Sequence, residues 1–394
     1  QMRFAPEEIQ LLTAASAYLV PDSVTSIRHP APDFFPVSIR PVQPKPAQEA
    51  GEKVEGGVFI SGGFVLNRKP ALPWCNLLQS GELGTLLSDQ SPGFTWYGNA
   101  RENKLTPWYN DSRTDNRGEL LLLRVDGAVY DLCAGAKVTF SPDFALYEGI
   151  AGPVEYRCCV TAQEGKKKLE IAYTSSQAVP LTFAFYTETV LGVNRDTARF
   201  ITGAWDHETL ALRNPYNTAL TGELRISAKG GELGYICDRN AFFGGRWHER
   251  SLLPLWDPCG AVTVSKTPRM GEKGCVEFTL SFVPDQPREA LPAASGSGIR
   301  IQTPDRLLNH MFNTWLPHQV ENGRIRGRTG FWQCGGAFGF RDQLQDSLAA
   351  MYWNPALTRA LLIKAAAHQC PGGDVLHWWH ELEGGDCGVR TRCY

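Results

Sequence analysis

The sequence predicts a large antiparallel β-sandwich followed by the first helices of an incomplete toroid of helical hairpins. From about residue 57 to 285, apolar residues alternate with mostly polar ones in short runs that turn-forming residues separate. Near residue 300 the apolar spacing changes to steps of three and four residues, which is the period of a helix. The helical part, residues 304–394, is too short to close a toroid.

Period-two alternation is clearest in three runs in the middle of the chain. Every second residue in each run is apolar or aromatic, as expected of strands with one face in a core. Frequent turn residues and the lack of intervening helices favour a sandwich. The runs are 154–160, 169–173 and 181–185, and the turns include 141–143, 164–165 and 229–231.

Helix-start signals mark three helices in the second part. Thr303 is a capping residue followed by Pro304 at the first helical position, and apolar residues then recur over 307–316. A second helix is expected from about Phe340, and a third has Asn354 as its cap with a proline after it. We therefore expect a helix (5–20) and a linker or wrapping arm within 1–56, the sandwich in 57–285, a linker in 286–303 and the helical part in 304–394.

The composition argues against several classes of partner. The 39 basic and 41 acidic residues nearly balance, so we expect no nucleic-acid partner and no anionic membrane surface. No uncharged apolar run approaches the roughly 18 residues of a membrane helix, and Glu7 and Glu8 stand where a signal peptide carries positive charge. The eleven cysteines follow no regular framework, which indicates reduced thiols in a cytoplasmic protein.

The two ends of the chain predict a segment of a longer polypeptide. The first residue is Gln1 rather than methionine, and Tyr394 follows directly on a run dense in glycine, tryptophan and carboxylates. That run suggests carbohydrate chemistry, since tryptophan rings stack on sugars, although they also fill cores.

Arg341, Asp342 and Asp346 lie at the start of the second expected helix. The two carboxylates are four residues apart and share a helix face, so their mutual repulsion requires a neutralising partner. Sugar hydroxyls, which donate to carboxylates, or the Arg341 guanidinium would serve. The alternative is one carboxylate favoured by the helix dipole and one that is solvated.

The glycine-rich stretch 335–339 precedes that helix and allows a ligand to approach the backbone closely. The helix N-terminus would favour an anion, although the stretch is neither a GxGxxG nor a P-loop pattern. Arg324, Arg326 and Arg328 lie upstream and could make fork-shaped contacts to phosphate. A basic run of this kind is also common on a solvated face.

The run HWWHE at 377–381 has two histidines three residues apart, with Cys387 and Cys393 beyond. A zinc site is one interpretation, but the spacing matches no common ligand framework. We favour tryptophans and histidines that line a sugar or phosphate pocket, and we expect no metal.

The stretch 91–111 is a dense polar segment inside the sandwich. Its residues are too polar and irregular for a strand pair. We expect a loop that either caps a neighbouring site or is ordered on the surface by Asx turns.

These stretches together resemble the inverting glycoside phosphorylases of glycoside hydrolase family 94, which include cellobiose, chitobiose and 1,2-β-oligoglucan phosphorylases and part of the cyclic β-1,2-glucan synthases. The resemblance covers about residues 57–394, and its last two motifs are highly specific. The HWWH form is more similar to the 1,2-β-glucan members than to the cellobiose members. The matching segments are PWCNLLQSGELGTLLSDQSPGFTWYGNARENKLTPWYND (73–111), YTETVLG (186–192), DRNAFFGG (238–245), GGAFGFRDQLQD (335–346), GDVLHWWHE (373–381) and GVRTR (388–392).

The resemblance implies a supersandwich-like domain, a helical linker and an (α/α) barrel of six helical hairpins, of which this chain would hold the first helices. It also implies a homodimer whose sandwich loops help complete the active site. In such enzymes inorganic phosphate attacks the anomeric carbon while an aspartic acid protonates the departing oxygen. No catalytic base is required, because phosphate is itself a competent nucleophile. Phosphate is then a co-substrate, the product is an α-glucose 1-phosphate, and no cofactor is implied.

Carried over motif by motif, the resemblance assigns roles to individual residues. Arg341 and Asp346 would hold hydroxyls of the sugar being cleaved, and Asp342 would contribute less. Arg328 is the candidate for phosphate. The sugar site would also include Trp378, Trp379 and His380.

The family's general acid lies in an SDD-type motif directly after the segment that here reads GVRTRCY, and the sequence does not contain that motif. Glu381 and Glu383 do not occupy its position. We therefore expect no general acid among these residues and no turnover by the chain alone. The alternative function is a noncatalytic carbohydrate-binding or assembly module, or a pseudo-enzyme remnant.

Overall fold

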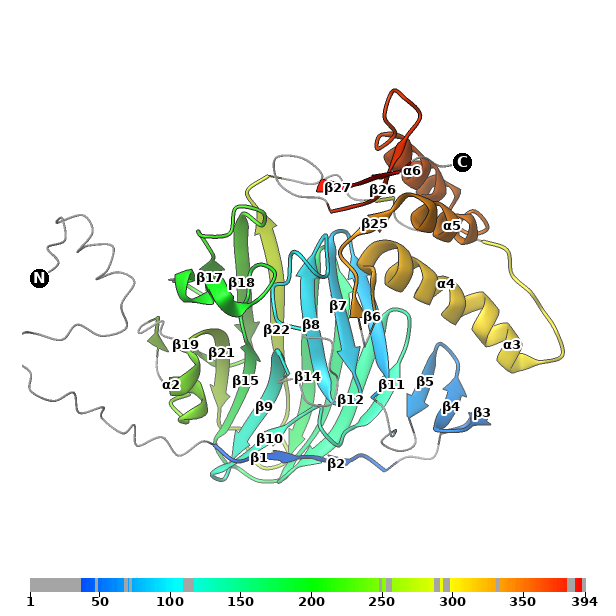
Figure 1. The fold of residues 1–394 in the computed structure, drawn as a ribbon. Helices are drawn as coiled ribbons and strands as arrows, with labels where there is room; N and C mark the ends of the chain where they lie inside the picture. The colour runs from blue at the N-terminus through cyan, green and yellow to red at the C-terminus, as the bar shows by residue number, and fades with distance from the viewer. Residues whose placement is uncertain are drawn as a thin grey trace, which may run out of the picture. The chain divides into compact units, whose positions relative to one another are not determined.

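The structure is a computed structural model with two large sheets whose inner faces share one core (Figure 1). The predicted β-sandwich is therefore confirmed. The expected helix at 5–20 lies outside the described part of the chain. The structure describes residues 37–46, 49–66, 70, 73–108, 117–247, 250–252, 257–286, 291–292, 298–330, 333–380 and 387–391.

One large sheet has seven strands and the other has twelve, and nearly all of their pairings are antiparallel. In spatial order, the seven are β1 (Ile39–Pro41), β10 (Ala128–Asp131), β9 (Glu119–Val125), β15 (Leu181–Thr187), β21 (Pro258–Lys266), β19 (Glu232–Asp238) and β20 (Arg250–Ser251). The twelve are β16 (Thr202–Asp206), β17 (Thr209–Arg213), β18 (Gly222–Lys229), β22 (Lys273–Pro284), β14 (Lys166–Ser175), β13 (Val154–Gln163), β12 (Phe144–Ala151), β11 (Lys137–Phe140), β5 (Gly63–Leu66), β4 (Gly57–Ile60) and β3 (Glu52–Val54), with β2 (Gln43–Pro44) beside β12.

Aromatic side chains from both sheets meet in the core. The rings of Phe185 on β15 and Phe278 on β22 lie 6.0 Å apart. The alternation predicted for β13 and β14 is present, but β15 is buried on both faces. Its outer residue Tyr186 stacks on Phe242 of the short helix α2 (Arg239–Phe243). That second layer explains why all seven residues of β15 are shielded from water.

The predicted turns lie between strands as expected. Glu164 and Gly165 both have positive φ, which is typical of the tight turn of a hairpin, here between β13 and β14. The arm before the sandwich contributes β1, which pairs with β10, and β2, which pairs with β12. Ten described residues, 37–46, thus pair with both large sheets.

A small third sheet contains β6 (Cys75–Ser80), β7 (Leu83–Ser88) and β8 (Ser91–Tyr97). The expectation of an irregular loop from residue 91 is wrong for its first part, because 91–97 form the almost wholly buried strand β8. The polar side chains of this strand are satisfied inside the protein, as when Thr95 Oγ1 donates to Glu119 Oε1 at 2.6 Å.

The helical part begins with one continuous helix over 306–327 in which α-helical turns alternate with wider π-helical turns. Asp305 caps it by accepting a hydrogen bond from the Leu308 amide, so the expectation that Thr303 caps a helix with Pro304 inside it is wrong. Thr303 instead accepts from the Asp305 amide in the turn before the helix. The helix is made of α3 (Arg306–His310), η2 (Met311–Trp315), α4 (Leu316–His318) and η3 (Gln319–Gly327).

Two further helices match their predicted starts. The helix α5 spans Phe340–Ala350, and α6 spans Pro355–Ala366 with the Asn354 side chain accepting from the Leu357 amide as its cap. In Figure 1 the helix α3–α4 runs beside β6, where His318 contacts Asn76. Within the described ranges, no helix has the length and apolar character needed to cross a membrane. The remaining elements are the 3₁₀ helix η1 (Arg195–Phe200) and the strands β23 (Thr329–Gly330), β24 (Gln333–Cys334), β25 (Phe338–Gly339), β26 (Val375–His380) and β27 (Cys387–Thr391).

Candidate functional site

A small antiparallel sheet brings the two most specific sequence motifs together. In it β26, which carries the HWWH run, pairs on one side with β25 and on the other with β27. Phe338 is the register partner of Trp379, and Gly339 is the partner of Trp378. Since α5 begins at Phe340, the tryptophans lie beside the N-terminus of the helix that carries Arg341, Asp342 and Asp346.

The two tryptophans have different environments because neighbouring residues of a strand face opposite ways. Trp379 is only 1% exposed and stacks on His368 at 4.0 Å and on Phe338 at 5.7 Å. Trp378 is 38% exposed, with its ring edge-on to His380. In this arrangement Trp378 presents a surface to solvent, whereas Trp379 packs inside the protein.

Two cations lie over the ring of Phe338. The guanidinium of Arg328 and the ammonium of Lys364 are each 4.3 Å from its centroid, which is within cation–π range. Arg328 ends the long helix in the left-handed conformation, with φ of 50°. The proposed phosphate residue is thus placed within the same cluster as the HWWH strand.

The two carboxylates of α5 are neutralised by two different arginines. Arg341 pairs with Asp342 at 3.1 Å, and Arg324 pairs with Asp346 at 2.9 Å. The Arg341 side chain is 86% exposed, whereas that of Asp346 is 20% exposed. The sequence correctly indicates that this like-charge pair requires compensation, but it does not identify Arg324 as the partner of Asp346.

Arg326, the middle residue of the basic run, serves the packing of the helices. Its guanidinium binds Glu321 Oε1 at 2.8 Å, and the Trp353 indole donates to Glu321 Oε2 at 3.3 Å. Both charged side chains are largely buried. The Arg326 guanidinium is therefore engaged within the protein, where it stabilises the packing of the helices.

The loop after β8 contacts the helical part at the candidate site. Asn99 forms an Asx turn by accepting from the Arg101 and Glu102 amides, and its side-chain amide donates to the Gly336 carbonyl at 3.0 Å. Glu102 Oε1 lies 3.3 Å from His380 Nδ1, an ion pair when the imidazole is protonated. A Cβ atom at Gly336 would lie 2.8 Å from Arg101 Cδ, so the absence of a side chain permits this close approach. The predicted Asx-turn ordering is thus present at Asn99, and the loop also contacts the glycine-rich stretch; that it caps a ligand site stays a prediction.

A buried polar network holds that loop in place. Lys167 and Glu119 are both fully buried and pair at 2.6 Å. Glu119 Oε1 also accepts from the hydroxyls of Thr95 on β8 and Thr106 in the loop. Burial lowers the pKa of Lys167, and the adjacent Glu119 carboxylate opposes that effect. Neither residue stands out in the sequence, because Lys167 lies in a run of three lysines and Glu119 is a single carboxylate directly before four leucines.

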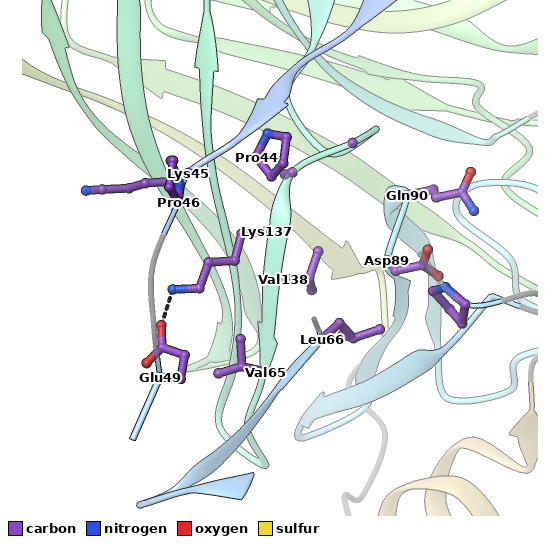
Figure 2. A pocket seen from close by; sticks show the side chains of 13 residues that line it. Pro44, Lys45, Pro46, Glu49, Val65, Leu66, Asp89, Gln90, Lys137 and Val138 are labelled. Carbon is purple, nitrogen blue, oxygen red and sulfur yellow. Dashed lines mark hydrogen bonds and ion pairs between the residues drawn. The ribbon is translucent and has the colours of Figure 1, made fainter. Parts of the chain in front are cut away.

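A cavity of about 390 Å³ lies on another part of the sandwich, between the arm and the strands β5 and β11. Figure 2 shows Lys137 directed at Glu49 across this cavity, and Glu148 lies 3.3 Å from the same ammonium. The Lys137 ammonium at this cavity is therefore neutralised by the protein itself.

The described residues contain no group of three or more His, Cys, Asp or Glu side chains arranged to hold a metal ion. His377 is exposed, and His380 faces Glu102. Glu381 and Glu383 lie outside the described residues, as does Cys393, and the side chain of Cys387 is not described. The described cysteines form no disulfide with one another.

Comparisons with known proteins identify the family of the chain. Residues 64–265 match the family model "Glycosyl hydrolase 94, supersandwich domain", and residues 296–393 match "Glycosyl hydrolase 94 superfamily, catalytic domain". The cyclic beta-(1,2)-glucan synthase NdvB of Rhizobium meliloti (strain 1021) is 35% identical over 376 residues, which cover 81% of this chain and 13% of that protein. The N,N'-diacetylchitobiose phosphorylase of Vibrio furnissii is 24% identical over 366 residues, which cover 77% of this chain and 45% of that protein.

A third relative matches a shorter stretch. The solabiose phosphorylase of Paenibacillus borealis is 33% identical over 89 residues, which cover 22% of this chain and 10% of that protein. The chain thus spans less than half the length of each of these relatives. Because the supersandwich match alone covers more than half of its residues, the chain belongs to the glycosyl hydrolase 94 family.

Proposed function

We propose that this chain forms the sugar-binding wall of an inverting glycoside phosphorylase that cleaves a β-linked glucan, of the 1,2-β-oligoglucan type. One observation carries the proposal: the Asn99–Gly336 hydrogen bond and the Glu102–His380 contact hold the sandwich loop against the glycine-rich stretch and the strand β26, which both belong to the family motifs. Family membership and the name of the 35% identical glucan synthase support the reaction and the linkage.

The described side chains suit recognition of a neutral sugar beside an anion. Asp346 has a carboxylate that keeps acceptor capacity for a sugar hydroxyl while it binds Arg324. Arg341 is exposed enough to reach a ligand, and Trp378 offers an exposed ring for stacking. Arg328 would bind phosphate, the co-substrate that attacks the anomeric carbon with inversion.

The helices have exposed apolar faces that support a larger helical barrel. Leu308, Phe312 and Leu316 are spaced by four residues along one helix, and each is at least 40% exposed. Further exposed apolar side chains lie on or just after α5 and α6. They are Leu348, Met351, Tyr352, Leu362 and Ile363. Further helical hairpins of an (α/α) barrel would cover these faces, since exposed apolar patches of this kind mark interaction sites.

Catalysis in this proposal depends on a general acid that the printed sequence does not supply at the family's motif position. In this proposal the chain therefore binds glucan but does not cleave it. A homodimer and a cytoplasmic location, which the resemblance and the cysteine pattern suggest, are part of the same proposal.

The test measures binding and turnover separately on the 394-residue chain. Calorimetric titration with a 1,2-β-glucooligosaccharide should show saturable binding, which Asp346→Asn should weaken by at least ~10-fold, the effect of losing a hydrogen bond to a charged group. The matched control is Asp206→Asn, since Asp206 is an exposed carboxylate on β16. Incubation with the same sugar and phosphate should release no glucose 1-phosphate.

Separate results would contradict the expected glucan binding and the expected lack of turnover. Equal glucan binding by the parent chain and by Asp346→Asn would contradict the assignment of Asp346 to the sugar site. Robust release of glucose 1-phosphate would instead show that the chain contains a working acid.

An assembly module is the second candidate, and the exposed apolar helix faces favour it. An assembly module would associate through those faces without binding glucan. Size-exclusion chromatography with light scattering, combined with the titration above, distinguishes the two functions. Because Phe312 is not one of the proposed sugar-site residues, Phe312→Ser should alter association alone.

A further inference from the structure

A cavity of about 400 Å³ lies beside the loop that follows β8. Its walls come from that loop, from the segment around η1 and from β24. Three of the side chains that line it are cationic and one, Asp196, is anionic. The lining residues used below are Arg101, Lys104, Trp108, Asn194, Arg195 and Asp196.

Lys104 is a buried cation without a carboxylate in ion-pair range among the described residues. It is 6% exposed, and its ammonium donates to the carbonyls of Arg101 at 3.0 Å and Val193 at 2.9 Å. An ammonium has three N–H donors, so one donor is left beyond these two bonds. Burial lowers the pKa of Lys104, as expected for an ammonium that is not fully compensated.

The other two cations that line the cavity are already paired with carboxylates. Arg195 binds both Glu188 and Asp257, and Glu102 lies near His380 and Arg101. The Asp196 carboxylate accepts a hydrogen bond from the side-chain amide of Asn194 at 2.9 Å. Lys104 is therefore the lining cation that has no carboxylate in ion-pair range among the described residues. It lies next to the half-exposed Arg101, and the Glu102 carboxylate acts on it only from a longer distance.

This differs from the cavity in Figure 2, where Lys137 is neutralised by two carboxylates. A buried cation is normally paired, because its desolvation is otherwise uncompensated. A bound anion would supply the missing charge at Lys104, and the Arg101 guanidinium could share it through charge-assisted hydrogen bonds.

We propose that this cavity is a binding site for a small phosphate-class oxyanion, held by Lys104 and Arg101. The site is separate from the phosphate role assigned to Arg328, which does not line the cavity. It requires no turnover, so it can be tested whether or not the chain takes part in phosphorolysis.

The test titrates the 394-residue chain with inorganic phosphate at constant ionic strength, set with sodium chloride, and follows heat and the unfolding temperature. We expect saturable binding and a rise in unfolding temperature, since a ligand that binds only the folded state stabilises it. Arg101→Gln should weaken binding by at least ~10-fold. Arg225→Gln is the matched control, because Arg225 and Arg101 are both 50% exposed and Arg225 lies on β18.

Two further variants separate this site from others. Lys104→Met should abolish the component of binding that belongs to this cavity. Because the variant also removes two hydrogen bonds to backbone carbonyls, its unfolding temperature is measured in phosphate-free buffer as well. Arg328→Gln should remove only the separate phosphate role assigned to Arg328, and the component of phosphate binding that depends on Lys104 and Arg101 should remain. Absence of phosphate binding beyond the chloride control would overturn the proposal, and so would loss of binding in Arg328→Gln with retention in Arg101→Gln.

Discussion

The side-chain amide of Asn99 donates a hydrogen bond of 3.0 Å to the backbone carbonyl of Gly336, across 237 residues of sequence. The same side chain orders its own loop, because its carbonyl oxygen accepts from two backbone amides. One residue thus connects the sandwich with the helical part at the candidate site.

Exchanging Asn99 for aspartate separates these two roles. A carboxylate at this position cannot donate to the Gly336 carbonyl but keeps the acceptor of the Asx turn, so Asn99→Asp should loosen only the contact between the loop and the glycine-rich stretch. Asn99→Ala should lose both the Asx turn and the bond to Gly336, which should lower the unfolding free energy by about 1–3 kcal/mol. Hydrogen exchange of the amides in 335–339 reports the contact, and equal protection in the parent and Asn99→Asp would contradict the prediction.

The buried pair of Lys167 and Glu119 should be sensitive to the loss of one partner. Glu119→Gln leaves the Lys167 ammonium uncompensated, which should cost about 3–5 kcal/mol. The double variant Glu119→Leu with Lys167→Met should be less destabilised than the sum of its single changes. Urea unfolding of the four proteins in a double-mutant cycle checks this, and simple additivity would count against a direct interaction.

The exposed pair of Arg225 and Glu223 provides the control for that cycle. Arg225→Gln should change the unfolding free energy by no more than about 1 kcal/mol, because exposed ion pairs are screened by water.

His318 should make stability depend on pH. Its Nδ1 accepts a hydrogen bond from the side-chain amide of Asn322 at 3.0 Å, and its Nε2 donates to Asn76 Oδ1 at 2.9 Å. An imidazole with one acceptor and one donor nitrogen is neutral, so the neutral form fits this site. Burial lowers its pKa from 6.5 to about 4. Between these values the unfolded chain binds more protons than the folded one, so stability is full above about pH 6.5 and falls as pH decreases toward 4.

The total loss over that range should be about 3 kcal/mol. Urea unfolding at several pH values measures it, and His318→Gln should flatten the dependence relative to the parent. The exposed His207→Gln is the control and should keep the parent's profile. A His318→Gln profile that parallels the parent would assign the acid sensitivity to other groups.

Asn354 should contribute to the stability of α6 through its cap. Its side chain accepts from the Leu357 amide at 3.1 Å. Asn354→Ala should cost about 1 kcal/mol, whereas Asn354→Ser, which keeps an oxygen acceptor, should cost less. Thermal unfolding of both variants tests this, and an equal loss in the two would point to packing rather than capping.

The sequence predicts the elements whose signals are local. Period-two alternation identifies β13 and β14, and a capping residue followed by proline identifies the start of α6 at Asn354. The same rule fails at Thr303, because Asp305 two residues later is an equally good cap and the helix begins after it. When two nearby residues are equally good caps, the sequence alone does not decide which of them begins the helix.

The candidate site was predictable in composition but not in its contacts. The motif residues around Arg341 and the HWWH run are recognisable in sequence, whereas Arg324 as the partner of Asp346 depends on how two helices pack. Trp378 and Trp379 are adjacent residues of the same type, so the sequence does not show which one is buried. The pairing of β26 decides this. The proposed sugar, phosphate and oxyanion contacts stay predictions.

The short strands β1 and β2, which pair with different sheets, have a consequence for solubility. Since β1 lies at the border of the seven-stranded sheet, removing residues 37–46 would uncover the backbone donors and acceptors of β10. An uncovered strand of this kind is a template for pairing with another molecule. A version without residues 37–46 should therefore precipitate or form oligomers more readily than the parent chain, even where its core still folds.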